Sequence, residues 1–370
     1  SSSNTTGYNG DSERTSREHS LLQRAVNFIA SSVPTSLNID YDSDGYVDNV
    51  CFVVKGNVGD WSDLLWPHRW SLYSQSVYIN SKRVYDYNFM LEGSTSYFAT
   101  RVLCHEMQHT LSFPDFYHYD DNTINPVGSW DLMCSTSNPP QNSGAFAKYK
   151  YGNWIDSIPL ITTPGTYTLS PLATSPTGNA YKIASEQPGQ FYVLEYRSTN
   201  SQFDSAIPGS GILIYKIDED YQGNAGYNGT TVFDEVYVYR PNGTNTTNGN
   251  VSQAFYNATV GRTAFNSTTN PRPFFTDGSY SSLSITNITP AGTTISFTYN
   301  GFLPTIVSNS SQLEFSGNAP TGALPQSVSV TGLFLTDSIT VTASSQFLVS
   351  RNNSVWYSTL KLPISGGLLY

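Results

Sequence analysis

The first predicted element is a helix near the start of the chain. Apolar residues recur there at helical spacing: Leu21, Leu22, Ala25, Phe28 and Ile29. This spacing predicts a helix with one buried face. The segment TSRE, residues 15–18, has the form of a capping box and predicts the helix start, and Pro34 follows the expected end.

Short apolar runs bounded by Gly, Pro and Asn dominate the rest of the chain, and such runs predict strands. The β-branched run at 50–54 predicts a buried strand, and one further helix is expected from about residue 96 to 111. After residue 154 we expect strands in the following segments: 191–197, 211–218, 236–241, a hairpin over 283–299, and short strands at 327–332, 339–343 and 347–350.

Length and composition narrow the class of protein. A chain of 370 residues is longer than a domain with a single hydrophobic core usually is, so two or three domains are expected. Charged residues make up 12% and aromatic residues 14%, a balance typical of β-rich proteins outside the cytoplasm. The net charge of −10, without basic clusters, argues against nucleic acid as a partner. No apolar stretch of the sequence is long enough to predict a transmembrane segment.

The segment HEMQH carries the first candidate chemistry. His105 and His109 are four positions apart on the predicted helix, so both imidazoles face one point, where neutral imidazole suits zinc. Glu106 lies beside that point and can exchange a proton with a water molecule there. Pro114 ends the helix, and Asp115 can return as a third ligand. The alternative is a pair of core histidines without a metal.

A second candidate metal site precedes the first strand. Four aspartates surround Gly45 in the sequence DYDSDGYVD: Asp40, Asp42, Asp44 and Asp48. Carboxylates at alternate positions around a turn-forming glycine are typical of a calcium loop. An EF-hand is excluded because Cys51 stands where its last glutamate is required. The alternative is a solvated acidic turn.

Several motifs in a fixed order carry a family resemblance. HEMQHTLSFPDFYHY is followed by VGSWDLM and GAFAKYKYGNW, and DYDSDGYVD, LLWPHRW, VLEYR and FDSAIPGSGILIYKID also match. The set resembles the immune inhibitor A type of zinc metallopeptidase over roughly residues 15–299. That family's metal motif, HExxHxxGxxD, maps onto His105, Glu106, His109 and Asp115. Ser112 replaces its glycine, and a serine held at positive φ there is expected to cost on the order of 1 kcal/mol.

The resemblance also suggests roles for other residues. Met133 matches the methionine of the metzincin turn beneath the zinc histidines. Without the resemblance, Met133 would be interpreted as an ordinary core residue. Cys104 and Cys134 could then meet in a disulfide, with buried free thiols as the commoner state. Further candidates are His68, expected to be mainly structural, Glu195, expected to be a paired structural carboxylate, and an oxyanion-stabilising or cleft residue among His118, Tyr117, Tyr119, Tyr149 and Tyr151.

The C-terminal 70 residues resemble the immunoglobulin-like repeats of surface proteins of gut Bacteroidetes, which implies a longer natural chain. We therefore expect a metzincin-like α+β catalytic domain over residues 1–156. A β-rich domain packed on it should cover 157–300, and an immunoglobulin-like β-sandwich, either complete or truncated, should cover 301–370. These last two make up the β-sandwich-type part of the predicted fold.

The resemblance implies a secreted or surface-displayed bacterial zinc endopeptidase, here without its signal peptide. Glu106 would serve as general base and acid, with Zn²⁺ and Ca²⁺ as cofactors. Its partners would be protein or peptide substrates, and the molecule is expected to be a monomer. The competing hypothesis is a catalytically decayed surface adhesin or glycan-binding protein, which Ser112 and the abundance of tyrosine favour.

Overall fold

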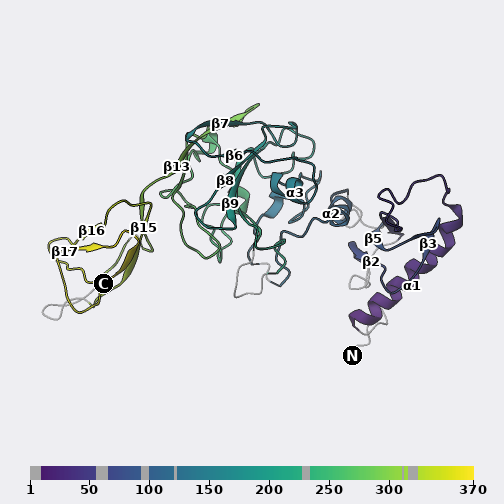
Figure 1. The fold of residues 1–370 in the computed structure, drawn as a ribbon, viewed down its shortest axis with the longest axis horizontal. Helices are drawn as coiled ribbons and strands as arrows, with labels where there is room; N and C mark the ends of the chain where they lie inside the picture. Colours follow the sequence, from purple (N-terminus) through teal and green to yellow (C-terminus); the bar gives the residue numbers. More distant parts are fainter. Residues whose placement is uncertain are drawn as a thin grey trace.

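The computed structural model describes residues 10–55, 66–92, 100–120, 123–226, 234–310, 312–315 and 324–370. Over these residues the chain is a mixed α/β protein, with most of its regular structure in strands of several sheets and few helices. The molecule is elongated, with the helix of residues 11–29 and the C-terminal strands at opposite ends (Figure 1). No helix in the described part of the chain is both long and apolar enough to cross a lipid bilayer.

The N-terminal part packs one helix against a three-stranded sheet. Its elements are α1 (Asp11–Ile29), β1 (Val50–Val54), β2 (His68–Ser71), the short hairpin β3 (Tyr78–Ile79) and β4 (Lys82–Arg83), and β5 (Asp86–Leu91). In the sheet, β5 is central, β1 is parallel to it and β2 antiparallel. Leu22 and Val26 of α1 join Tyr87 and Phe89 of β5 in one buried cluster. The predicted strand at 50–54 is confirmed.

Three local predictions in this part are wrong: the start of the helix, the burial of Phe28 and the burial of the strand at 50–54. The helix begins at Asp11, so residues 15–18 lie inside α1 and do not cap it. Phe28 is 86% exposed because the face toward the sheet is formed by Leu22 and Val26 together with polar residues of the preceding turn. Strand β1 is only half-buried, because among the described strands it lies at the sheet edge.

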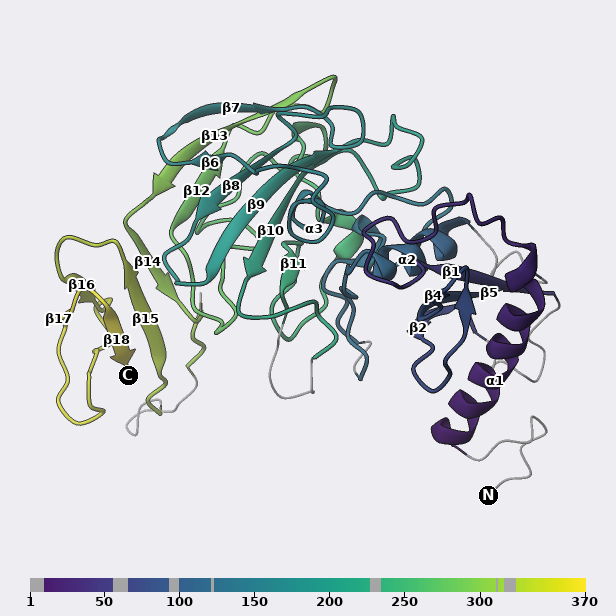
Figure 2. The same ribbon diagram turned by 45° about the vertical axis from the view of Figure 1, so that its right-hand side comes forward.

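Helix α2 (Thr100–Thr110) packs on β2 and β5. It lies between the N-terminal sheet and the strand-rich centre of the molecule (Figures 1 and 2). The predicted helix at 96–111 is confirmed from Thr100 onward, and its expected start falls outside the described residues. Short helix α3 (Ala145–Lys150) contacts β9 in the central sheet.

The centre of the molecule is a five-stranded sheet in the order β11-β10-β9-β8-β6 (Figure 2). Its strands are β6 (Leu160–Ile161), β8 (Ala180–Ala184), β9 (Gln190–Arg197), β10 (Gly211–Asp218) and β11 (Val236–Val238). Successive residues of β10 point to opposite faces, so that Ile214 and Leu213 enter different clusters and both faces are buried. This explains the continuous apolar runs that predicted these strands.

One face of the central sheet packs on a second sheet. That sheet has the order β12-β13-β7 and contains β7 (Gly165–Leu169), β12 (Leu283–Thr286) and β13 (Ile295–Phe302). The hairpin predicted over 283–299 is confirmed as the antiparallel pair β12 and β13. The other face covers Trp130, Met133 and Phe146, so residues on both sides of position 156 share one cluster. The division into three domains stays a prediction.

The C-terminal part has its own small cluster, which includes Leu360 and Leu362. Its strands are β14 (Thr305–Ser308), β15 (Val328–Leu333), β16 (Ile339–Thr342), β17 (Thr359–Leu362) and β18 (Gly366–Leu369). They form one sheet of three strands and one of two. The strand predicted at 347–350 is wrong, because Val349 makes only an isolated bridge to Tyr357.

Candidate metal centre

The turn after α2 directs the chain back toward the helix. The Phe113 amide donates to the Gln108 carbonyl and the Ser112 amide to the His109 carbonyl, each at 3.0 Å, which together form a Schellman motif. Ser112 occupies the left-handed position of that motif, with φ of 72°. The positive φ expected at the family's glycine position is therefore present, although a serine occupies it. The turn brings Asp115 to the histidines of α2.

Ser112→Gly is expected to stabilise the fold by about 1 kcal/mol, because glycine adopts positive φ without the clash of a Cβ atom. The measurement is urea unfolding monitored by tryptophan fluorescence. Ser112→Ala is the matched control, since it removes the hydroxyl but keeps the Cβ atom. Equal stability of the glycine and alanine variants would contradict the strain at this position.

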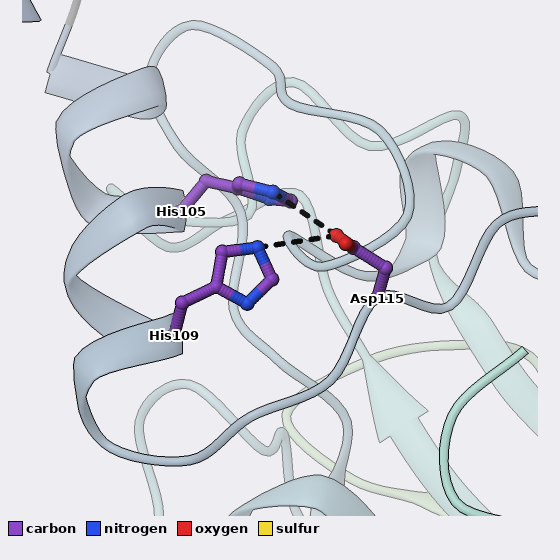
Figure 3. Close-up of side chains that lie close together, drawn as sticks. All are labelled: His105, His109 and Asp115. Atoms are coloured by element: carbon purple, nitrogen blue, oxygen red, sulfur yellow. Dashed lines mark ion pairs between the residues drawn. The ribbon is translucent and has the colours of Figure 1, made fainter. Parts of the chain in front are cut away.

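Three side chains converge at one point beside α2 (Figure 3). Asp115 Oδ1 lies 3.2 Å from His105 Nε2 and 3.3 Å from His109 Nε2. The candidate ligand atoms of the three residues all lie within 4.8 Å of one another. The structure therefore brings together the three predicted zinc ligands.

Backbone carbonyls fix the orientation of both imidazoles. His105 Nδ1 lies 2.9 Å from the Leu132 carbonyl oxygen, and His109 Nδ1 lies 2.8 Å from that of Phe113. Because a carbonyl only accepts, each ring donates from Nδ1 and leaves an Nε2 lone pair toward the convergence point. A hydrogen bond from the second ring nitrogen is the usual support of a metal-binding histidine.

Asp115 is buried, and its two carboxylate oxygens have different surroundings. Oδ2 accepts a hydrogen bond from the Tyr119 hydroxyl at 2.5 Å, whereas Oδ1 is buried without a hydrogen-bond donor in the described part of the chain. Burial opposes the charged form, but contacts with the protonated forms of the two histidines and with Tyr119 outweigh it and hold the pKa of Asp115 well below its usual range. When both imidazoles are neutral, the same buried oxygen faces two Nε2 lone pairs, an arrangement that fits a bound cation.

Glu106 lies beside the three ligands without joining them. It is 8% exposed, is absent from the converging set, and lines the same pocket as the histidines. Burial raises the pKa of its carboxyl, although the charged forms of His105 and His109 oppose that shift. This is the environment expected of a carboxylate that exchanges protons.

Met133 lies in a tight turn against the segment that carries Asp115. Its amide donates to Asp131 Oδ1 at 2.8 Å, and its carbonyl accepts from the Phe116 amide at 2.9 Å. The preceding Leu132 supplies the carbonyl that orients His105. The side chain is fully buried in the cluster with Phe113 and Phe116. Met133 is thus a core residue that also belongs to the turn supporting the site.

The cysteines are all free thiols, so the disulfide considered between Cys104 and Cys134 is not formed. Cys134 is buried, and burial raises the pKa of its thiol to about 12. Its Sγ lies 2.9 Å from Asn125 Oδ1.

The structure separates the remaining candidates. His118 is buried against Asp234 Oδ1 at 2.6 Å and does not line the pocket at the metal site. Tyr117 and Tyr119 line that pocket. Tyr149 and Tyr151 do not line it, and the Tyr151 hydroxyl donates to Glu235.

Glu195 is a paired structural carboxylate, as the sequence predicted. It is fully buried, lies 3.2 Å from Arg197 Nη1, and accepts from the Ala145 amide at 2.6 Å. Arg197 also donates to the Trp130 carbonyl at 2.7 Å, so this pair holds the segment before the Met133 turn against the central sheet.

A pocket of about 320 Å³ opens at the candidate metal site. It is lined by the candidate ligands and Glu106, and also by residues of α1 and by residues 66–70. The sequence analysis assigned no pocket role to the four residues of α1 that line it: Arg14, Thr15, Glu18 and His19. His68 also lines the pocket, so it has both a structural contact and access to the cleft.

The acidic loop brings together three of its four aspartates. Carboxylate oxygens of Asp40, Asp42 and Asp48 lie within 4.8 Å of one another, and Asp44 is outside this set. Asp44 instead accepts a hydrogen bond from the Tyr46 amide at 2.8 Å. Lys82, which the sequence analysis did not single out, places its Nζ 2.5 Å from Asp40 Oδ2 and lowers the pKa of that carboxyl.

Comparisons with models of known protein families, with curated proteins and with solved structures found no match to this chain. The functional argument therefore depends on the geometry of the site and on the motifs of the sequence.

Proposed function

We propose that this protein is a secreted, metzincin-like zinc endopeptidase. The observation that carries the proposal is the convergence of two imidazole Nε2 atoms on the buried, donor-free Oδ1 of Asp115, with Glu106 beside them. Two histidines and one carboxylate form a common catalytic zinc set, which leaves a coordination position open. These residues fit zinc, and a bound zinc ion would polarise the scissile carbonyl and acidify a water molecule there.

The protein's own groups would then perform the proton transfers. Glu106 accepts a proton from the attacking water and delivers it to the nitrogen of the leaving amine. Its burial keeps the carboxylate poorly solvated and hence a better proton acceptor. Tyr117 lines the pocket and is the phenol available to donate toward the carbonyl oxygen of the substrate, because the Tyr119 hydroxyl already donates to Asp115.

Metal analysis combined with a protease assay tests the proposal. The purified protein should contain about one zinc ion per chain and hydrolyse casein. 1,10-Phenanthroline should abolish hydrolysis, and added zinc should restore it. Zinc without hydrolysis of casein or of a broad peptide mixture would favour the decayed adhesin instead, and absence of zinc binding would contradict the metal site itself.

We also propose that the acidic loop binds Ca²⁺ through Asp40, Asp42 and Asp48. Calcium at a hundredfold excess over its dissociation constant should stabilise the fold by about 2.7 kcal/mol, since it binds the native state alone. Asp42→Asn with Asp48→Asn should abolish the rise in melting temperature that calcium produces. Asp44→Asn is the matched control, because Asp44 lies outside the converging set. Equal melting of the wild type in calcium and in EGTA would show that the loop is only an acidic turn.

A further inference from the structure

The pocket at the candidate metal site is also lined by a guanidinium with few protein partners. Arg14 lies on α1, lines the pocket, and its side chain is 19% exposed. Its Cζ lies 4.4 Å from the centre of the Trp66 ring, so the guanidinium is held against the indole. Among the described residues it makes no side-chain hydrogen bond, and its ion pairs with Asp11 and Glu18 are long, at 3.6 and 3.7 Å.

Glu18, the nearest buried carboxylate, is engaged by other donors. Its Oε1 accepts from His68 Nε2 at 3.0 Å and from the Tyr87 hydroxyl. Burial opposes ionisation of Glu18, but these two contacts outweigh it and lower its pKa. Glu18 therefore stays ionised without a close contact to Arg14. Asp11, the other partner of Arg14, has a 96% exposed side chain, where solvent weakens the pair.

The other charged groups that α1 and residues 66–70 contribute to the pocket have close partners. His68 Nδ1 lies 2.8 Å from the Trp66 carbonyl oxygen, and its Nε2 faces Glu18. Arg69, which also lines the pocket, pairs with Asp86. Arg14 is therefore the cation of this part of the pocket without a close carboxylate, and its charge favours an anion there.

We propose that Arg14 forms a substrate subsite that binds a carboxylate of the peptide substrate. A guanidinium offers a planar fork of donors that matches a carboxylate, and the indole of Trp66 holds that fork in place. Because the same pocket contains Glu106 and the candidate zinc ligands, the bound carboxylate lies close to the scissile bond. For an endopeptidase this carboxylate belongs to an Asp or Glu side chain. The inference rests on the proposed peptidase function for its substrate class.

The first test is a cleavage-site profile. Wild type and variants digest a library of proteome-derived peptides, and mass spectrometry identifies the cleaved bonds. Wild type should show Asp or Glu enriched at one position next to the cleaved bond. Arg14→Gln should lose that enrichment, and Arg14→Lys, which keeps the charge without the fork, should retain part of it. Arg17→Gln is the matched control on the same helix, because Arg17 does not line the pocket.

The second test measures binding without turnover, so that failure of the two proposals can be separated. Calorimetry on zinc-loaded Glu106→Gln compares the blocked peptide acetyl-Ala-Ala-Glu-Ala-Ala-amide with its glutamine counterpart. The glutamate peptide should bind about tenfold tighter or more, as expected of charge-assisted hydrogen bonds. In the double variant Glu106→Gln with Arg14→Gln, the ratio of the dissociation constants of the two peptides should be about one. The glutamine peptide with a free C-terminus shows whether a terminal carboxylate binds there as well.

The outcomes are distinct. Cleavage with no acidic preference, or with a preference that Arg14→Gln and Arg14→Lys leave unchanged, overturns the subsite and leaves the peptidase intact. Binding that depends on Arg14 without cleavage by the wild type supports the subsite and contradicts the peptidase. Arg14-dependent binding of the free C-terminus alone supports the carboxylate subsite and assigns it to peptide ends. Equal binding of all peptides overturns it.

Discussion

Glu106→Gln is expected to keep its zinc and to lower kcat/KM for peptide hydrolysis by roughly 10²–10⁴-fold. Glutamine has nearly the same shape as glutamate, so the buried position on α2 remains filled. Its amide cannot accept a proton from water. The other carboxylates that line the pocket are committed elsewhere, since Asp115 faces the histidines and Glu18 accepts from His68. No neighbour therefore replaces Glu106 as base.

Steady-state kinetics and metal analysis of the same preparation check this result. Glu13→Gln, on the more exposed surface of α1, is the control for loss of a carboxylate elsewhere. The acid limb of the wild-type pH profile should reflect protonation of the base. Because burial raises the pKa of Glu106, activity should fall at a higher pH than for an exposed glutamate. Near-wild-type turnover of the glutamine variant would remove Glu106 from the mechanism.

Asp115→Ala is expected to weaken zinc binding on the order of 100-fold or more, and activity should fall with it. Loss of an outer partner of a metal ligand typically costs about 10–100-fold in affinity, and Asp115 is placed as a ligand itself. The change leaves two neutral imidazoles and removes the anionic oxygen that faces both. Tyr119→Phe removes only the hydrogen bond to Oδ2 and should have a smaller effect.

Zinc titration of these variants against a competing chelator gives the affinities. Asp120→Ala is the matched control, because that aspartate is exposed in the same segment. A circular dichroism spectrum should show that each variant is folded. If Asp115→Ala binds zinc like the wild type and His118→Ala does not, the third ligand is the histidine and the assignment of Asp115 is wrong.

The convergence of the three candidate ligands could be predicted because these residues are local in sequence. Helical geometry alone places His105 and His109 on one face, and Pro114 explains why the chain leaves the helix before Asp115. Likewise, the apolar runs of β9 and β10 were recognised because both faces of that sheet are buried. In these segments, neighbouring residues carry enough information to define the element.

The part of the pocket formed by α1 and residues 66–70 could not be predicted, because its segments are far apart in the chain. Arg14 and His68 line one pocket because α1 packs on the β1-β5-β2 sheet, and no spacing in the sequence predicts that proximity. Lys82 reaches the acidic loop for the same reason. The start of α1 was misplaced because the TSRE motif also occurs in helix interiors, where its residues make no cap.

The short chain distance between the metal ligands has a consequence for folding. His105 and Asp115 are ten positions apart, so the closure entropy of the loop between them is small even in the unfolded chain. Loops of this length close in about 10–100 ns. If the segment binds zinc as proposed, it can capture the ion before the long-range contacts to Leu132 and Met133 form. Zinc bound to the unfolded chain reduces the net stabilisation of the native state, so that zinc should raise the melting temperature less than its native affinity alone implies.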